Sequence, residues 1–398
     1  MPPTLDIHCI AIGGTGMAPL ACLLKEQGHR VRGSDGPLYP PMSTLLAEAG
    51  ITPLPGYDPA HLEPPPDLVV VGNAVPSSNP EAQAAEARGL SRVSMPEALA
   101  RFFLAGRRPL VVAGTHGKTT TSAMAAWVLE ACGADPGYLV GGVPRARERS
   151  FRLGGGERFV VEGDEYNAAY FDRGPKFLHY RPETLILTSV EYDHADLYPT
   201  PEALVAAYGR LVDLLPATGL LVACGDAPAV REVARRARCR VILYGLEGDH
   251  EVAPESVDLT AASSRFVLAD PEAGPVEIAL PLPGRHNVAN ALAVWTAARH
   301  DGHPVERVAA GLAGFAGVHR RLEEIGTAAG VTVVDDFAHH PTAVAVTLAA
   351  LRQRHPGRRL VAVFEPRSLT AGRAFFFASY RDAFRGADRL FLAPIFHA

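Results

Sequence analysis

The stretch GTHGKTTT (114–121) constrains the fold of this chain more than any other feature. It follows the apolar run PLVVA (109–113) and precedes the helical pattern SAMAAWVLEACG (122–133). A glycine-rich turn between a strand and a helix presents backbone N–H groups at the helix N-terminus, where the helix dipole favours an anion. The sequence therefore predicts an α/β fold that binds the phosphates of a nucleotide, ATP, at this turn.

The residues of this turn that we expect to contact ATP are Gly114, Thr115, His116, Gly117, Lys118, Thr119 and Thr120. Lys118 would reach the terminal phosphates, and the Thr119 hydroxyl would coordinate Mg²⁺. The motif departs from G-x-x-x-x-G-K-[ST], because Val112 stands where the first glycine is expected. The alternative is a tight strand–helix turn with an exposed lysine.

The composition limits the classes of protein to consider. A chain of 398 residues is long enough for two or three domains. Its net charge of −5 argues against broad electrostatic binding to nucleic acid or to an anionic membrane. The five cysteines form no CxxC pair, no apolar run is long enough to cross a bilayer, and the N-terminus lacks a cleavable leader. We expect a cytoplasmic protein that binds neither nucleic acid nor membrane; the oligomeric state stays open.

Short apolar runs alternate with helical patterns along most of the chain, which predicts parallel sheets covered by helices. We expect a first domain at 1–107, a central domain at 108–316 and a third domain at 317–398. Within the central domain, residues 255–284 predict an antiparallel ribbon and residues 285–302 a helix. The third stretch is shorter than a typical domain of ~100–150 residues, so we expect it to be truncated.

Two acidic motifs each follow a predicted buried strand. EGDEY (162–166) follows RFVV, and EYDH (191–194) follows TLILTSV. Because the carboxyl ends of parallel strands meet at one edge of a sheet, we expect Glu165 and His194 to help Thr119 hold divalent cations beside the phosphates. Taken singly, Glu165 could be a solvated loop acid and His194 a histidine hydrogen-bonded in a turn.

Two motifs in the second half of the chain add polar side chains. GRHNVAN (284–290) offers Asn287 and Asn290, whose amides suit an adenine edge, although asparagines at a helix start are commonly caps. HRR (319–321) offers two arginines, which could stabilise charge on a phosphoryl group or simply lie on the surface.

The motif DDFAHHP (335–341) follows the predicted strand VTVV. Asp336 could accept a hydrogen bond from a ribose hydroxyl, and His339 or His340 could contact a substrate. The alternative is a loop that ends before Pro341.

The stretch GGTG (13–16), after the first predicted strand, resembles part of a dinucleotide-binding fingerprint. Asp35 closes the next strand, where such folds place an acidic residue. However, Pro19 stands where the third glycine of G-x-G-x-x-G is expected. The loop therefore suits a pyrophosphate, while a nicotinamide-dependent dehydrogenase is a weaker alternative.

The ordered set GGTG, GTHGKTTT, EGDE, DH, GRHNVAN, HRR and DDFAHHPT resembles the Mur ligase family along essentially the whole chain. The resemblance implies a Rossmann-like N-terminal domain that binds a UDP-sugar, a central P-loop ATPase domain, and a Rossmann-like C-terminal domain that presents the amine substrate.

The resemblance also implies the reaction. ATP would drive the joining of the carboxylate of UDP-N-acetylmuramate to the amine of L-Ala-γ-D-Glu-meso-diaminopimelate through an acyl phosphate. The segment DEYNAAYFDRGPKFLHY (164–180) favours this tripeptide as the amine. The alternatives are addition of L-alanine to the same UDP-sugar and a non-catalytic protein that binds a nucleotide sugar.

The resemblance also implies a full set of residue roles. The expected catalytic residues are Lys118, Glu165, His194, Arg321 and His340, with His340 as a candidate base; the expected Mg²⁺ ligands are Thr119, Glu165 and His194. Further ATP contacts are Asn287, Asn290, Arg320, Arg321 and Asp336. UDP-sugar contacts are Gly13, Gly14, Thr15, Gly16, Met17, Asp35 and Asn73, and peptide contacts are Arg367 and Ser368. No lysine lies between Leu197 and Leu215, so a carbamylated lysine between metal ions is not expected.

Overall fold

The computed structural model describes residues 3–366 and 374–395. The chain divides into two compact units, each assembled from three separate segments of sequence. The first unit contains Met1–Val111, Asp135–Gly141 and Ser150–Pro182; the second contains Val112–Ala134, Gly142–Arg149 and Glu183–Ala398. Strand β6 (Arg108–Ala113) carries the chain from the first unit into the second.

The first unit is built on a parallel five-stranded sheet with the order β3-β2-β1-β4-β5. The alternation of strands and helices predicted for this part of the chain is confirmed. The elements are β1 (Asp6–Ile10), α1 (Met17–Glu26), β2 (Arg30–Asp35), α2 (Met42–Glu48), β3 (Leu54–Pro55), β4 (Leu68–Val71), α3 (Pro80–Ala87), β5 (Arg92–Ser94) and α4 (Met95–Leu99).

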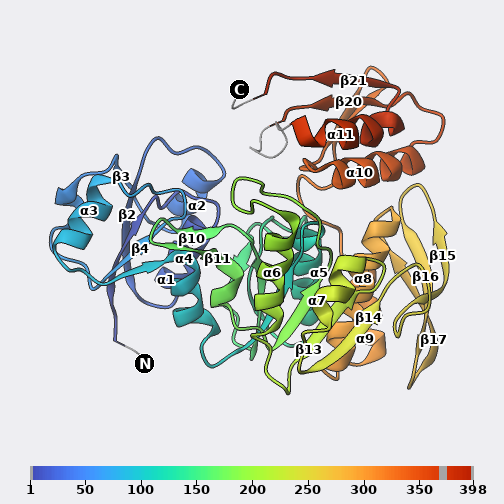
Figure 1. Cartoon of the computed structure of the whole chain (residues 1–398), viewed down its shortest axis with the longest axis horizontal. Coiled ribbons are helices and arrows are strands. Elements are labelled where there is room, and N and C mark those ends of the chain that lie inside the picture. The colour runs from blue at the N-terminus through green and yellow to red at the C-terminus, as the bar shows by residue number, and fades with distance from the viewer. Residues whose placement is uncertain (1–2, 367–373, 396–398) are drawn as a thin grey trace. The chain divides into compact units, whose positions relative to one another are not determined.

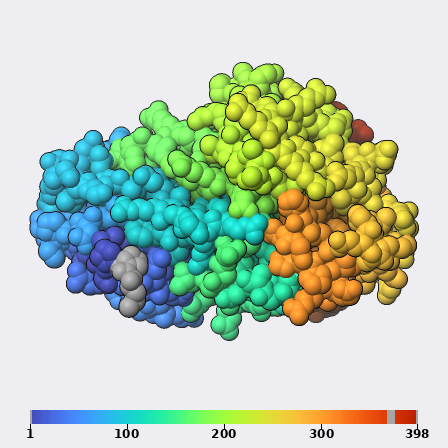
Figure 2. Space-filling view, turned by 90° about the horizontal axis from the view of Figure 1, so that it is seen from below, coloured from blue at the N-terminus to red at the C-terminus, as the bar shows by residue number. Residues whose placement is uncertain are grey.

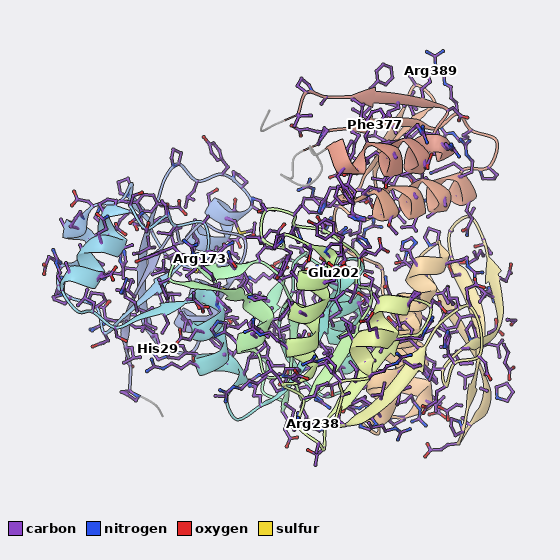
Figure 3. The ribbon with its side chains drawn as sticks, viewed as in Figure 1. His29, Arg173, Glu202, Arg238, Phe377 and Arg389 are labelled. Carbon is purple, nitrogen blue, oxygen red and sulfur yellow. The ribbon has the colours of Figure 1, made fainter. Side chains whose placement is uncertain are left out.

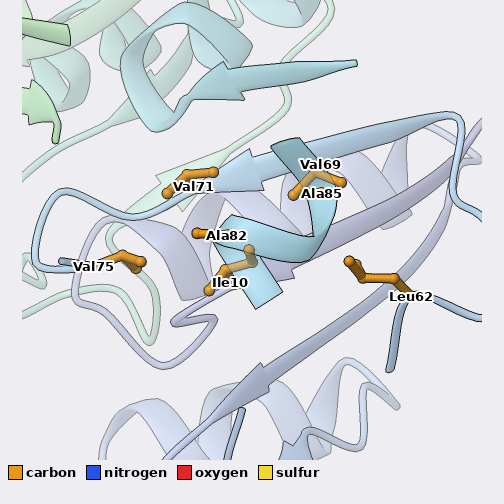
Figure 4. Close-up of a cluster of buried hydrophobic side chains, with 7 residues drawn as sticks. All are labelled: Ile10, Leu62, Val69, Val71, Val75, Ala82 and Ala85. Carbon is orange, nitrogen blue, oxygen red and sulfur yellow. The ribbon is translucent and has the colours of Figure 1, made fainter. Parts of the chain in front are cut away.

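Apolar side chains from β1, β4 and α3 form a core on one side of this sheet, as Figure 4 shows. Helix α3 begins cleanly because the Asn79 side chain accepts hydrogen bonds from the backbone N–H groups of Glu81 and Ala82, and Pro80 occupies the first helical position. The cluster residues are Ile10, Leu62, Val69, Val71, Val75, Ala82 and Ala85.

The first unit also includes short strands that the apolar pattern did not indicate. β7 (Gly137–Leu139) pairs with β9 (Arg158–Gly163) in parallel and with β8 (Phe151–Arg152) in antiparallel orientation. β10 (Asn167–Ala169) and β11 (Asp172–Pro175) form a hairpin that carries Arg173, labelled in Figure 3. β9 was predicted from the run RFVV, whereas β7, β8, β10 and β11 contain only two to four residues each. Strands this short cannot display a period of two, which explains why they were missed.

The second unit contains the parallel strands β12, β13 and β14, flanked by helices. The predicted helix at 285–302 is present as α8, in which Val288, Leu292 and Trp295 are buried, and it packs against α5 and β13. The elements are α5 (Lys118–Ala131), β12 (Thr184–Leu187), α6 (Pro201–Val212), β13 (Leu220–Cys224), α7 (Pro228–Ala234), β14 (Arg240–Tyr244), α8 (Arg285–His300) and α9 (Val305–Ala313).

The predicted antiparallel ribbon is present in the second unit as β15 (Pro254–Leu259), β16 (Ser264–Asp270) and β17 (Gly274–Leu280). Phe266, Leu268, Ile278 and Leu280 are buried and alternate with exposed or partly buried residues, so one face of the ribbon packs inward. β17 contacts α9, and their surfaces adjoin in yellow and orange in Figure 2.

Residues 317–395 follow within the second unit. β18 (Glu323–Ala328) and β19 (Val331–Asp335) form an antiparallel pair, whereas β20 (Val361–Phe364) and β21 (Arg389–Leu392) form a separate parallel pair. Helices α10 (Pro341–Arg354) and α11 (Phe377–Ala383) pack on each other beside β20 and β21 (Figure 1). Among the described residues, no helix is both long and apolar enough to span a bilayer.

Candidate functional site

The predicted phosphate loop connects β6 to α5, and Gly117 caps the helix with a φ of +80°. The residues that follow β12 hold the loop in place. The Thr115 backbone N–H donates to the Ser189 carbonyl oxygen at 3.1 Å, and its hydroxyl accepts from the Glu191 backbone N–H at 2.8 Å. The His116 backbone N–H donates to Ser189 Oγ at 2.9 Å. The loop is therefore held in place by a neighbouring strand end.

Lys118 begins α5 and folds back over the loop. Its Nζ donates to the carbonyl oxygen of Gly114 at 2.7 Å and to that of Thr115 at 3.4 Å. Thr119 is buried, and its Oγ1 lies 3.4 Å from Nη2 of Arg321. The structure thus brings an arginine from residues beyond 316 to the first turn of α5.

A cavity of about 320 Å³ opens beside this loop. Four of the predicted ATP contacts from other parts of the chain, Asn287, Asn290, Arg321 and Asp336, line it together with His116, Gly117, Thr119 and Thr120. The two asparagines are buried; Asn287 Nδ2 donates to the Pro283 carbonyl oxygen at 2.8 Å, and Asn290 Nδ2 lies 3.5 Å from Asn287 Oδ1.

The two arginines of the HRR motif have different surroundings. Arg321 lines the cavity, whereas Arg320 Nε donates to Asp335 Oδ2 at 3.1 Å. Asp336 accepts hydrogen bonds from the backbone N–H groups of Leu322 at 2.7 Å and Ala338 at 2.8 Å. The Asp336 carboxylate therefore fixes the turn that presents Arg321, in addition to facing the cavity.

The cavity also exposes residues that sequence reasoning did not single out. Arg145 lines it and donates through Nη2 to the Arg321 carbonyl oxygen at 2.9 Å, and burial lowers the pKa of its guanidinium. Tyr244, Leu282 and Pro283 form an apolar side of the cavity that suits a nucleobase. In the sequence, only the position of Arg145 after the glycine pair of GGVPR could have indicated that it belongs to the site.

His194 is buried in the loop after β12 and has a φ of +53°. Its backbone N–H donates to Oδ1 of the neighbouring Asp193 at 2.7 Å, and its Nε2 lies 3.8 Å from Oδ2 of the same carboxylate. A positive φ is uncommon for residues other than glycine, and such strain clusters at functional sites. Glu165 is buried in the first unit, in the loop after β9.

Glu191, His116 and His340 form a compact cluster in the second unit, which we call the His–Glu–His cluster. Glu191 Oε2 lies 3.3 Å from His116 Nε2 and 3.8 Å from His340 Nδ1, and accepts from the Thr342 hydroxyl at 2.6 Å. Burial raises the pKa of Glu191, but the hydrogen bond and charge of His116 outweigh it and bring the pKa to about 2. Burial and the nearby His116 lower the pKa of His340 to about 4.

His340 caps helix α10 with its own side chain. Nδ1 accepts from the Thr342 backbone N–H at 3.3 Å, and Nε2 lies 3.3 Å from the Tyr192 carbonyl oxygen. The ring is therefore neutral at pH 7, and both of its nitrogens already have partners within the second unit.

The predicted UDP-sugar contacts lie at the carboxyl ends of β1, β2 and β4 in the first unit. Asp35 accepts from the backbone N–H of Gly13 at 2.7 Å through Oδ2, and from Tyr57 Oη at 3.0 Å through Oδ1. Asp35 thus holds the glycine loop. Gly14, Thr15 and Asn73 are exposed, Gly16 is partly buried as the residue before α1, and Met17 is buried. Arg367 and Ser368 lie outside the described residues.

The first unit also contains a buried polar network centred on Glu81. Glu81 has no exposed surface; its Oε2 lies 3.1 Å from His8 Nε2 and accepts from the Ser34 hydroxyl, and its Oε1 lies 2.6 Å from His61 Nδ1 and 3.1 Å from the Asp58 backbone nitrogen. Burial raises the pKa of Glu81, but the hydrogen bonds from His8, Ser34 and His61 outweigh it and lower the pKa. The network ties β1 and β2 to the loop that carries Tyr57.

Comparison with known proteins places this fold and site in a defined class. Family models described as the Mur ligase family catalytic domain, the Mur ligase middle domain and the Mur ligase glutamate ligase domain match residues 6–107, 112–298 and 320–394. The chain belongs to the Mur ligase family. It is an ATP-dependent ligase with three α/β domains, so the dehydrogenase alternative is wrong.

Within the family, the chain is 43% identical over 395 residues to UDP-N-acetylmuramate–L-alanyl-γ-D-glutamyl-meso-2,6-diaminoheptandioate ligase of Escherichia coli K12, which covers 99% of this chain and 86% of the relative. It is 42% identical over 397 residues to UDP-N-acetylmuramate–L-alanine ligase of Kineococcus radiotolerans, covering 98% and 82%. The crystal structure of a murein peptide ligase from Psychrobacter arcticus matches with a TM-score of 0.81 and 36% identity, covering 98% of this chain and 84% of that one.

Proposed function

We propose that this ligase joins the carboxylate of UDP-N-acetylmuramate to the amine of L-Ala-γ-D-Glu-meso-diaminopimelate, as part of peptidoglycan recycling in the cytoplasm. The observation that carries the proposal is the similarity along 99% of this chain to the E. coli ligase named for these two substrates. Because a relative named for L-alanine is almost as similar, addition of L-alanine is the second candidate.

The cavity supports ATP as the energy source. Its apolar side, with Tyr244 and Leu282, suits a base, and the buried amides of Asn287 and Asn290 suit the edge of adenine. The loop N–H groups and Lys118 then suit the phosphates. In this proposal Lys118 exchanges its contacts with the Gly114 and Thr115 carbonyl oxygens for contacts with phosphate oxygens.

The proposed chemistry has two steps. A lactyl carboxylate oxygen attacks the γ-phosphorus in line, which breaks the bond to the β-phosphate oxygen and gives an acyl phosphate and ADP. The amine then attacks the acyl carbon, and the tetrahedral intermediate collapses to the amide and inorganic phosphate with loss of one proton. Arg321 and Lys118 would offset the negative charge that develops on the phosphoryl oxygens.

Mg²⁺ is a further part of the proposal, with Thr119, Glu165 and His194 as its ligands. The donor set fits a divalent cation, because the Thr119 hydroxyl and the buried Glu165 carboxylate are hard oxygen donors. The buried carboxylate of Asp193 lies beside His194. When bound, Mg²⁺ would supply positive charge against the phosphate oxygens.

His340 is proposed as the residue that takes the proton from the amine. It would accept the proton at Nδ1, the nitrogen that accepts from the Thr342 backbone N–H in this structure. A pKa of about 4 keeps the ring neutral and able to accept a proton at pH 7, although it limits its strength as a base.

The same proposal assigns residues 1–107 to UDP-sugar binding, 108–316 to ATP binding and 317–398 to the amine substrate. The three ranges matched by the family models fall inside these boundaries. The glycine loop held by Asp35 would bind the pyrophosphate of the UDP-sugar.

The test is phosphate release with ATP, Mg²⁺ and UDP-N-acetylmuramate, in parallel reactions with the tripeptide and with L-alanine, and with product masses measured. We expect release and the amide product with the tripeptide. Phosphate release with L-alanine alone would support the second candidate function, addition of L-alanine to UDP-N-acetylmuramate. The absence of ADP with either amine would favour the non-catalytic nucleotide-sugar-binding protein.

A further inference from the structure

The His–Glu–His cluster brings together three potential metal-ligand atoms from three elements of the second unit. His116 belongs to the phosphate loop, Glu191 follows β12, and His340 caps α10. A ring nitrogen of His116, a carboxylate oxygen of Glu191 and a ring nitrogen of His340 all lie within 4.8 Å of one another. Within the described residues 3–366 and 374–395, the cluster is the one group of three or more histidine, cysteine, aspartate or glutamate side chains that could hold a metal ion.

We propose that this cluster is a binding site for a transition-metal ion of the Zn²⁺ type, separate from the Mg²⁺ ligands proposed above. Two imidazoles and one carboxylate, with a fourth position left for water or a ligand, form the donor set that Zn²⁺ uses at open sites. Mg²⁺ prefers oxygen ligands in octahedral geometry, so two imidazole nitrogens argue against it here.

The distances are close to those that Zn²⁺ requires. Zn–N and Zn–O bonds of about 2.0–2.2 Å place neighbouring ligand atoms of a tetrahedron about 3.3–3.6 Å apart. Glu191 Oε2 already lies 3.3 Å from His116 Nε2 and 3.8 Å from His340 Nδ1. The two rings pack with their centroids 4.5 Å apart, so small rotations of the imidazoles suffice to enclose an ion.

The surroundings of the cluster also match a metal site. The contact of His340 Nε2 with the Tyr192 carbonyl oxygen selects the tautomer in which Nε2 carries the proton and Nδ1 has the lone pair. A bound ion would replace the Thr342 backbone N–H, which donates to Nδ1 at 3.3 Å, as the partner of that lone pair. The Thr342 hydroxyl orients the Glu191 carboxylate through a hydrogen bond. The Phe376 ring lies 5.3 Å from the His340 ring and provides an apolar wall that limits access of water.

An ion at this position would join the phosphate loop and the end of β12 to helix α10. It would also occupy His340 Nδ1, so Zn²⁺ and the base role of His340 would exclude each other. Zn²⁺ should therefore slow amide exchange at the start of α10, and should inhibit ligation if His340 is the base. The first effect needs no substrate and does not depend on the proposed function.

The experiment measures Zn²⁺ affinity of the metal-free, nucleotide-free 398-residue chain by competition with a chromophoric chelator, with Co²⁺ absorption as a second probe. We expect one equivalent to bind. Glu191→Gln preserves size and should weaken the affinity by at least about 10-fold, and His340→Ala by the same or more. Circular dichroism confirms that each variant is folded.

His319→Ala is the matched control. It removes an exposed histidine whose Nδ1 lies 2.6 Å from Glu323 Oε1, a histidine–glutamate pair that is not part of the three-residue cluster. It should bind Zn²⁺ like the unmodified chain. The proposal is overturned if the unmodified chain binds no Zn²⁺, if Glu191→Gln and the control bind equally, or if excess Mg²⁺ displaces the ion.

Discussion

Replacing Glu81 should destabilise the first unit far more than its position on a short helix suggests. The carboxylate is fully buried and receives hydrogen bonds from His8, Ser34 and the Asp58 backbone. In Glu81→Gln, the amide NH₂ replaces one oxygen and faces N–H or O–H donors. The loss of about two charge-assisted hydrogen bonds, with their partners left buried, should cost about 3–5 kcal/mol.

The pH dependence gives an independent check of this reasoning. Since the folded-state pKa of Glu81 is lowered, its contribution is fully present above the unfolded pKa of about 4.5 and is lost as the pH falls through the folded value. The native chain should therefore lose stability below pH 4.5 by a component that Glu81→Gln lacks.

The assay is hydrogen exchange read by mass spectrometry on peptides from β1 and α3, which reports the free energy of opening of the first unit by itself. Glu86→Gln is the control: it lies on the same helix, is exposed, and pairs with Arg92 at 3.3 Å, a contact worth at most about 1 kcal/mol. Equal exchange in the two variants, or an unchanged acid profile in Glu81→Gln, would refute the argument.

Three further predictions concern the nucleotide site. Lys118→Ala should abolish ADP formation in the ligation assay while binding of the UDP-sugar, followed by calorimetry, stays nearly intact; joint loss would contradict the domain assignment. Arg321→Ala should lower kcat by about 10²–10³-fold, because its guanidinium reaches Thr119, whereas Arg320→Ala should change the rate little. Gly117→Ala should lose about 1–2 kcal/mol to backbone strain and raise the KM for ATP, because the added Cβ would lie 2.9 Å from Asn290 Oδ1. Gly28→Ala, with a φ of +97° and no atom within 4 Å of the Cβ, should show the strain alone in thermal melts.

The sequence predicted those parts of the structure that local patterns determine. Apolar runs located the central strands, and glycines located the two loops, because strand periodicity and left-handed turns depend on neighbouring residues. The contacts of Glu191 could not be found in this way, since its partners His116 and Thr342 lie 75 and 151 residues away. The motif EYDH was singled out for His194. Its first residue, Glu191, is the one whose side chain contacts both the phosphate loop and α10.

The same limit applies to the arginines of the HRR motif and to the third domain. Nothing in HRR distinguishes Arg321 from Arg320; the positive φ of Arg320 and the hydrogen bond of Asp336 to the Leu322 N–H decide which guanidinium turns toward Thr119. The short strands β18 and β19 form an antiparallel pair, whereas β20 and β21 form a parallel pair. The apolar content of a strand does not determine which other strand it pairs with, so these partners could not be predicted.

The division of each unit into three sequence segments has a consequence for synthesis on the ribosome. The first unit gains its last strands, β10 and β11, only after the phosphate loop and α5 have emerged. Arg92, which also pairs with Glu86, then acquires a second partner, the Tyr170 hydroxyl at 2.8 Å. A fragment that ends at residue 107 therefore lacks part of the first unit. Such a truncated chain would correspond to an intermediate of synthesis and not to a complete domain.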